Sequence, residues 1–117
     1  MLKIALIDDQ EYGIAQIINS IPKGIKYDFV HFFSYKDALE QKFDIAFIDY
    51  FLDIDGVKGE DIIDLIDANI KIGFSSVEKC NKKFLEKNAA YSVNKLNSTS
   101  NPELEEIFML ILFDDLK

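Results

Sequence analysis

The stretch from Phe43 to Leu52, FDIAFIDYFL, decides the fold. Its apolar residues form a short run that is typical of a strand buried on both faces of a parallel sheet. A charged side chain is not tolerated deep inside such a strand unless it is paired or binds a metal. We therefore expect the strand to end at Ile48. Asp49 then lies at the carboxyl end of the strand, where open parallel sheets bind ligands. The alternative is that Asp49 only begins a loop.

Strand patterns and helix patterns alternate five times along the chain. Strands are expected over residues 3–7, 27–33, 44–48, 70–74 and 89–94. Helices are expected over residues 11–21, 60–68, 77–88 and 102–116, with a capped short helix around Ala38 and Leu39 within residues 34–42. This alternation predicts an α/β fold with a parallel sheet covered by helices on both faces. Right-handed crossovers leave few topologies, and the flavodoxin-like strand order 2-1-3-4-5 is the best match for five units.

Composition limits the kind of protein. The 117 residues fit one domain, residues 1–117, and no apolar run approaches the ~20 residues of a membrane span. Met1 leads directly into a strand pattern, so we expect no signal peptide. The lone Cys80 excludes an internal disulfide and fits a reducing, cytoplasmic setting. The net charge of −8 argues against a nucleic-acid partner, because such binding depends on neutralising phosphates.

Acidic residues follow two strands that the predicted order makes neighbours. Asp8 and Asp9 follow the first strand, and Asp49 follows the third. Three carboxylates at one rim of the sheet repel one another unless a cation neutralises them. Carboxylate oxygens are ligands that Mg²⁺ prefers. The sequence therefore predicts a divalent-metal site, and the alternative is three solvated loop acids.

Two further strand ends point to the same rim. Ser75 ends the fourth strand, and Lys95 follows the fifth. A hydroxyl and an ammonium beside a metal-bound carboxylate form a site for a phosphoryl group. We expect Asp49 to act as the nucleophile, Mg²⁺ and Lys95 to balance the charge, and Ser75 to donate a hydrogen bond.

In this arrangement the whole chain resembles the response-regulator receiver domains of two-component signalling. The resemblance rests on LIDDQ at 6–10, SYKDALE at 34–40, DIAFIDYFL at 44–52, GFSS at 73–76 and the lysine at 95. It implies that Asp49 is the phospho-acceptor. It also implies roles for five other residues: Asp8, Asp9 and the backbone carbonyl of Phe51 as further Mg²⁺ ligands, Ser75 as the switch hydroxyl, and Lys95 as the phosphate-binding lysine.

Several positions depart from the receiver pattern. Asp53 and Leu96 stand where the family usually has Pro. The family's Gly that opens the third helix is matched by Gly59 or by Gly56, and the choice of Gly59 makes the preceding loop longer. The switch aromatic normally lies three residues before the lysine, where this chain has a serine.

Tyr91 is the nearest aromatic, one residue further from the lysine than the family's switch residue. In a regular strand, alternation sends Tyr91 to the face opposite Ser92, and only a bulge would restore it. The aromatic part of the switch is therefore a point on which the sequence and the family differ.

The resemblance implies a signalling protein rather than an enzyme. It would accept a phosphoryl group from a sensor histidine kinase or a phosphotransfer protein, and would catalyse its own phosphorylation and slow dephosphorylation. Slow loss is expected because Phe51 and Val77 are apolar at positions where receivers tune water access. Phosphorylation would shift a partner-binding face made of the fourth strand, fourth helix, fifth strand and fifth helix. Unless the chain is cut from a longer protein, we expect no effector domain, and output would then come through a protein partner or a phosphorelay.

Two other functions are kept as alternatives. The longer loop and the misplaced aromatic favour a receiver-like interaction module that does not depend on phosphorylation. An aspartyl-phosphate type of Mg²⁺ phosphatase is disfavoured, because it needs an Asp where Phe51 stands. His31, in the second strand, is expected to be structural rather than a phosphotransfer histidine.

Overall fold

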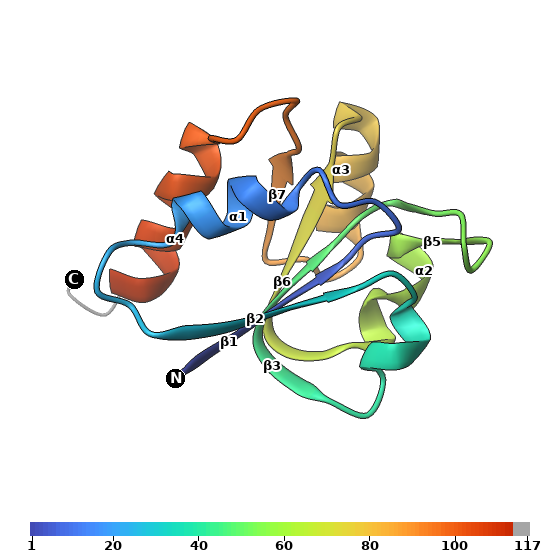
Figure 1. Cartoon of the computed structure of the whole chain (residues 1–117). Helices are drawn as coiled ribbons and strands as arrows, with labels where there is room; N and C mark the ends of the chain where they lie inside the picture. Colours follow the sequence, from blue (N-terminus) through green and yellow to red (C-terminus); the bar gives the residue numbers. More distant parts are fainter. Residues whose placement is uncertain (114–117) are drawn as a thin grey trace.

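The computed structural model describes residues 1–113 and contains a five-stranded parallel sheet in the order β2-β1-β3-β6-β7 (Figure 1). In chain order of these strands, this is 2-1-3-4-5, so the predicted fold class is confirmed. The strands are β1 (Leu2–Ile7), β2 (Tyr27–Phe32), β3 (Lys42–Ile48), β6 (Asp67–Ser75) and β7 (Tyr91–Asn94). A separate antiparallel hairpin, β4 (Phe51–Leu52) and β5 (Val57–Lys58), follows β3.

The ladder between β1 and β3 aligns the ends of these two strands. Ile7 lies opposite Ile48, and the backbone N–H of Asp49 donates to the carbonyl of Ile7 at 2.9 Å. On the other side of β1, the N–H of Asp8 donates to the carbonyl of Phe32 at 3.1 Å. Both acids therefore leave the sheet at the same level, as the sequence predicts.

Helices cover the two faces of the sheet differently. On one face α1 (Ile14–Ser20) and α4 (Pro102–Phe113) lie side by side (Figure 1). They pack on the inward residues of that face, which include Leu6, Phe47 and Phe74. The other face has shorter pieces: η1 (Tyr35–Ala38), α2 (Gly59–Ile62), η2 (Ile63–Leu65) and α3 (Glu78–Glu86). Alternation along β1 sends Ala5 and Ile7 to this second face and Ile4 and Leu6 to the first.

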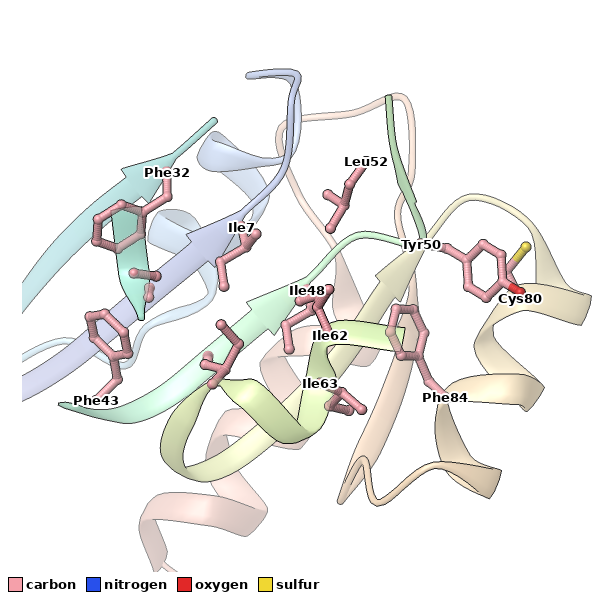
Figure 2. Packing of buried hydrophobic residues seen from close by; sticks show 14 residues of the cluster. Ile7, Phe32, Phe43, Ile48, Tyr50, Leu52, Ile62, Ile63, Cys80 and Phe84 are labelled. Atoms are coloured by element: carbon pink, nitrogen blue, oxygen red, sulfur yellow. The ribbon is translucent and has the colours of Figure 1, made fainter. Parts of the chain in front are cut away.

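The second face has its own core, in which aromatic rings fill the spaces between short helices. Figure 2 shows Ile62 and Ile63 of α2 and η2 over Ile48, with Phe84 of α3 beside them. The ring of Tyr50 packs against Phe84 with centroids 5.6 Å apart. Bulky side chains thus bury the second face of the sheet although its helices are short.

The helix predicted over residues 60–68 is wrong in its length. The helical backbone ends at Leu65, and Asp67 already belongs to β6, where it pairs with Lys42 of β3. Isoleucine-rich segments fit a strand as well as a helix, so the sheet ladder decides the boundary. The short capped helix expected around Ala38 and Leu39 is present as one 3₁₀ turn, η1. Its cap is the hydroxyl of Ser34, which accepts from the N–H of Lys36 at 3.3 Å.

The loop predicted over residues 53–59 is largely the β4–β5 hairpin. Gly56 has φ +66° in its turn, a conformation that favours glycine. Gly59 opens α2, and a Cβ there would lie 2.2 Å from the carbonyl oxygen of Asp49. Of the two candidate glycines, Gly59 is the one that opens a helix, and a glycine is needed there because the helix begins directly against the backbone of Asp49.

The other boundaries differ by a few residues. Helix α1 begins at Ile14 instead of residue 11, α3 covers Glu78–Glu86 instead of 77–88, and β7 begins at Tyr91 instead of residue 89. The predicted residues 114–116 of the last helix lie outside the described part of the chain. Within residues 1–113, no helix is long and apolar enough to cross a membrane.

Candidate functional site

Three carboxylates meet at the carboxyl end of β1 and β3. One side-chain oxygen from each of Asp8, Asp9 and Asp49 lies within 4.8 Å of the other two. Asp8 is fully buried, and the side chain of Asp49 is 13 % exposed. The predicted gathering of these acids at one rim is confirmed. The three acids lie close together because the ends of β1 and β3 are aligned in the sheet.

Lys95 enters this cluster from β7. Its Nζ lies 2.5 Å from Oδ2 of Asp8 and 3.1 Å from Oδ1 of Asp49. The backbone N–H of Lys95 makes the last ladder bond of the strand, to the carbonyl of Ser75 at 3.0 Å. The lysine side chain is only 2 % exposed, so its charge acts in a poorly solvated place.

The surroundings shift the pKa values of both groups. Burial raises the pKa of Asp49 to about 6, Lys95 opposes this rise, and the charge of Asp8 adds to it. Burial by itself lowers the pKa of Lys95, but Asp49 and Asp8 outweigh it, so the lysine pKa stays above its ordinary value. At neutral pH Asp49 is therefore an anion and Lys95 a cation.

Ser75 ends β6 beside these groups and is 2 % exposed. Its hydroxyl oxygen accepts from the N–H of Val77 at 3.1 Å, which leaves the hydroxyl hydrogen available for another acceptor. The backbone of Ser75 is bound by the side chain of Asn81, through both N–H and C=O. Ser75 is thereby connected to helix α3.

A hollow of about 280 Å³ joins the predicted residues. Its walls are formed by Asp9, Gln10, Tyr12, Asp49, Phe51, Asp53, Ser75, Ser76 and Lys95. Asp8 lies behind this surface and bonds Lys95. Phe51 stands on the wall with an exposed side chain, whereas the role of its carbonyl as a metal ligand stays a prediction.

Several residues near the site were not predicted. The Tyr12 ring lies over Lys95, with Nζ 4.8 Å from its centroid, and the N–H of Asp53 donates to Asp9 at 2.9 Å. Tyr12 and Asp53 could have been suspected as site neighbours, because each lies within four residues of a predicted acid in the sequence. His31 Nε2 donates to the carbonyl of Asp8 at 2.7 Å, so the histidine expected to be structural contacts the backbone of the acidic cluster.

The switch aromatic is not restored by a bulge. Strand β7 pairs regularly with β6, with Tyr91 opposite Ile72 and Ser92 opposite Gly73. Tyr91 is half-buried and packs against the core cluster on the face of the sheet that α1 and α4 cover. Ser92 instead lines a hollow of about 200 Å³ between α3, β7 and α4.

The donor set matches a divalent cation in charge and in chemistry. Three carboxylates and one ammonium carry a net charge of −2, which a divalent ion balances. All three acids offer hard oxygen ligands, which Mg²⁺ prefers over nitrogen or sulfur. One oxygen of Asp8 and one of Asp9 already accept backbone N–H groups, from Gln10 and Asp53, and these bonds orient the carboxylates.

No protein-family profile matches the sequence, and no curated protein matches it. Solved structures do. The BeF₃-activated receiver domain of Thermotoga maritima DrrB matches with TM-score 0.70 and 18 % identity, over 96 % of this chain and 97 % of that one. The phosphorylated cyanobacterial phytochrome response regulator RcpA matches with TM-score 0.72 and 14 % identity, over 97 % of this chain and 95 % of that one.

The response regulator domain of Thermotoga maritima CheB is a third similar structure. It gives a TM-score of 0.64 and 16 % identity, over 97 % of this chain and 92 % of that one. The agreement therefore covers nearly the whole of each domain, including the strand ends that carry the acidic cluster. The chain has the fold of a response-regulator receiver domain.

Proposed function

We propose that this chain, as one domain over residues 1–117, is a receiver that accepts a phosphoryl group on Asp49. The observation that supports it is the position of the Asp49 carboxylate. It stands at the end of the central strand, in a hollow, with the ammonium of Lys95 3.1 Å away. A buried but anionic carboxylate beside a fixed cation is a suitable nucleophile for phosphorus.

The donor we propose is a phosphohistidine of a sensor histidine kinase or a phosphotransfer protein. An oxygen of Asp49 attacks phosphorus, and the new P–O bond forms as the P–N bond to the donor imidazole breaks. The bonding electrons leave with the imidazole nitrogen, which then takes a proton. Lys95 offsets the charge of the transferring group, and the free hydroxyl hydrogen of Ser75 donates to one of its oxygens.

Asp8, Asp9, Asp49 and the carbonyl of Phe51 are the residues that would hold Mg²⁺. When bound, the ion supplies positive charge to the phosphoryl oxygens. The chain's own contribution is orientation: Asp8 holds Lys95 by a bond of 2.5 Å, and Gln10 fixes the other oxygen of Asp8.

Phosphorylation is proposed to reach a partner through the face made of β6, α3, β7 and α4. The physical connection available is Asn81 of α3, which bonds both backbone groups of Ser75 and the side chain of Asn94. A movement of Ser75 toward a phosphoryl oxygen would pull on this helix and shift its equilibrium between two positions. We expect this signalling to take place in the cytoplasm.

Intact mass after incubation with acetyl phosphate and Mg²⁺ tests the proposal. We expect one phosphoryl adduct on the wild type, and none on Asp49→Asn or in EDTA. No adduct on a folded wild type, from acetyl phosphate or from a phosphorylated histidine donor, would contradict it.

A second function is favoured by one observation. Tyr91 is half-buried against the core cluster on the α1 and α4 face, and β7 has no other aromatic ring that could follow Ser75. This suits an interaction module that works without phosphorylation. Its partner would bind wild type and Asp49→Asn with equal affinity, whereas a receiver partner would discriminate between phosphorylated and unmodified wild type.

A further inference from the structure

Two buried side-chain amides stand on either side of Lys95. Gln16, on α1, has no exposed surface, and Asn101, just before α4, is 1 % exposed. Each comes from a different part of the chain, and Gln16 is 80 residues from the segment that it bonds. Neither belongs to the hollow, so the proposed phosphoryl transfer does not by itself account for them.

Gln16 binds the residue that follows Lys95 through both of its backbone groups. Its Oε1 accepts from the N–H of Leu96 at 3.0 Å, and its Nε2 donates to the carbonyl of the same residue. The usual receiver Pro at this position has no N–H and could not make the first bond. Gln16 thus uses a backbone donor that exists because position 96 is Leu.

Asn101 binds the residue that precedes Lys95. Its Nδ2 donates to the carbonyl of Asn94 at 2.8 Å and to Oε1 of Gln16 at 2.9 Å. Its Oδ1 also accepts from the N–H of Leu104 at 3.2 Å, as an N-cap of α4. One side chain therefore ties the start of α4 to the chain before Lys95 and to Gln16.

The lysine backbone needs such support. Strand β7 ends at Asn94, and the bond from the N–H of Lys95 to Ser75 is the last of the ladder. Figure 1 shows the chain leaving the sheet after β7 and running toward α4, beside α1. Before Lys95, Asn101 binds the carbonyl of Asn94, and the carboxylate of Glu103 accepts from the N–H of Asn94 at 3.1 Å. After Lys95, Gln16 binds both backbone groups of Leu96.

Buried amides are an expensive way to pack a helix. A buried amide costs free energy unless its groups are hydrogen-bonded, and the neighbouring core positions of α1 are apolar, such as Ile14 and Ile17. Among residues 1–113, every buried side-chain nitrogen or oxygen has a partner. The network is complete, and it converges on the two residues that flank Lys95.

We propose that Gln16 and Asn101 are positioning residues for Lys95. They fix the backbone before and after it, so that Nζ stays between Asp8 and Asp49 at 2.5 and 3.1 Å. The importance of this position for phosphoryl transfer rests on the proposed function. The position itself does not, because the ion pairs exist in the unphosphorylated protein.

Gln16→Met is the main test, because Met has a similar size and lacks the hydrogen bonds. Asn19→Leu is the matched control: Asn19 lies on the same helix, and its Nδ2 donates to the carbonyl of Thr99 in the same loop at 2.8 Å, away from Lys95. We expect Gln16→Met to lower the rate of phosphorylation by acetyl phosphate about tenfold. Asn19→Leu should stay within twofold of the wild type. A rate for folded Gln16→Met within twofold of the wild type would overturn the positioning role in transfer.

A double-mutant cycle with Lys95→Ala tests the position without any phosphorylation. In metal-free buffer, Gln16→Met should lower the Tm by about 5 °C in the wild type and by less than half as much in Lys95→Ala. The shift caused by Asn19→Leu should be the same in both backgrounds. Additive shifts for Gln16→Met would overturn the proposal. A cycle that shows coupling while the wild type takes no phosphoryl group would contradict only the proposed function.

Asn101→Asp serves if Gln16→Met does not fold. It keeps the Oδ1 that caps α4 and loses the Nδ2 that binds Gln16 and Asn94. We expect about a threefold loss of phosphorylation rate and a Tm shift that again shrinks in Lys95→Ala. An unchanged rate together with an unchanged Tm shift would overturn the proposal.

Discussion

The carboxylate half of the site, Asp8, Asp9 and Asp49, is placed by backbone ladders, whereas the lysine half, Ser75 and Lys95, is held by side-chain amides. The N–H groups of Asp8 and Asp49 bond carbonyls of the adjacent strands at 3.1 and 2.9 Å. Around Ser75 and Lys95 one ladder bond, from the N–H of Lys95 to the carbonyl of Ser75, is supplemented by bonds from three amide side chains, Asn81, Gln16 and Asn101. The first half depends on strand pairing, and the second on contacts between helices and strand ends.

This difference predicts different responses to substitution. Changing an acid side chain removes charge and metal affinity but leaves the strand ends aligned, because backbone groups and the His31 bond to the carbonyl of Asp8 hold them. Changing a residue of the lysine half can either remove the charge of Lys95 or move it away from Asp8 and Asp49. The comparison can be tested by substitutions in each half, beginning with the lysine itself.

Lys95→Ala should have the largest effect on stability. It leaves Asp8 and Asp49 without their buried cation, which costs about 3–5 kcal/mol when one partner of a buried ion pair is removed. Mg²⁺ should recover more stability in this variant than in the wild type, because the ion then replaces the missing positive charge. Urea unfolding in EDTA and in Mg²⁺ measures both effects.

The exposed Lys87→Ala is the control, and we expect it to change stability by less than about 0.5 kcal/mol. Equal stabilisation of wild type and Lys95→Ala by Mg²⁺ would show that the lysine and the ion do not share the same carboxylates. The two halves of the site would then not be coupled through the charges of Lys95 and the carboxylates.

In the carboxylate half, Asp8→Asn and Asp9→Asn should each weaken Mg²⁺ binding at least about tenfold, because each removes one charged ligand. Asp8→Asn should also lower thermal stability more than Asp9→Asn, since only Asp8 bonds Lys95. Titration calorimetry with Mg²⁺ measures the affinities, with the exposed Asp61→Asn as control. Unchanged affinity in both variants would mean that the ion binds elsewhere.

The same contrast explains how far the sequence could be read. The acids of the carboxylate half were predictable, because each directly follows an apolar run and parallel strands end at one rim. Ser75 and Lys95 were found by the same reasoning at the other two strands. The end of the helix predicted over residues 60–68 was not predictable, since isoleucine-rich segments suit both helix and strand. The pairing of β6 with β3 decides where the helix stops.

The supports of the lysine half were out of reach for a different reason. Gln16 sits in an apolar helix pattern, and its partners Leu96 and Asn101 are 80 and 85 residues away. No local periodicity contains such a contact. The bond of His31 to the carbonyl of Asp8 was likewise not predictable, because it depends on the exact register of β1 and β2.

The pH dependence of stability should reveal the cost of burying Asp49. Its pKa is about 6 in the folded protein and ordinarily 3.8, so the unfolded chain loses this proton at lower pH. In metal-free buffer the wild type therefore loses stability between about pH 4 and pH 6, and Asp49→Asn does not. Chemical unfolding at several pH values should show the variant gaining on the order of 1 kcal/mol by pH 7.

The gain is less than the shift alone implies, because Lys95 loses one of its two partners in Asp49→Asn. Asp64→Asn, at an exposed position, controls for a change of net charge. A stability difference that stays constant from pH 4 to pH 7 would show that Asp49 is not held in a poorly solvated place. The carboxylate half would then be solvated like an ordinary loop.

The smallest effect should come from the wall of the hollow between the two halves. Phe51 is 47 % exposed and offers no polar group to a water molecule near Asp49. If Asp49 carries a phosphoryl group, Phe51→Gln should speed its hydrolysis about threefold to tenfold, because an amide can orient the attacking water. The decay of the phosphorylated mass after removal of acetyl phosphate measures the rate. Ile54→Gln is matched in chemistry, since this exposed residue of the same hairpin does not line the hollow. An unchanged lifetime for Phe51→Gln would mean that Phe51 does not limit the rate of hydrolysis. Lys95 and Ser75, in the lysine half, would then set that rate.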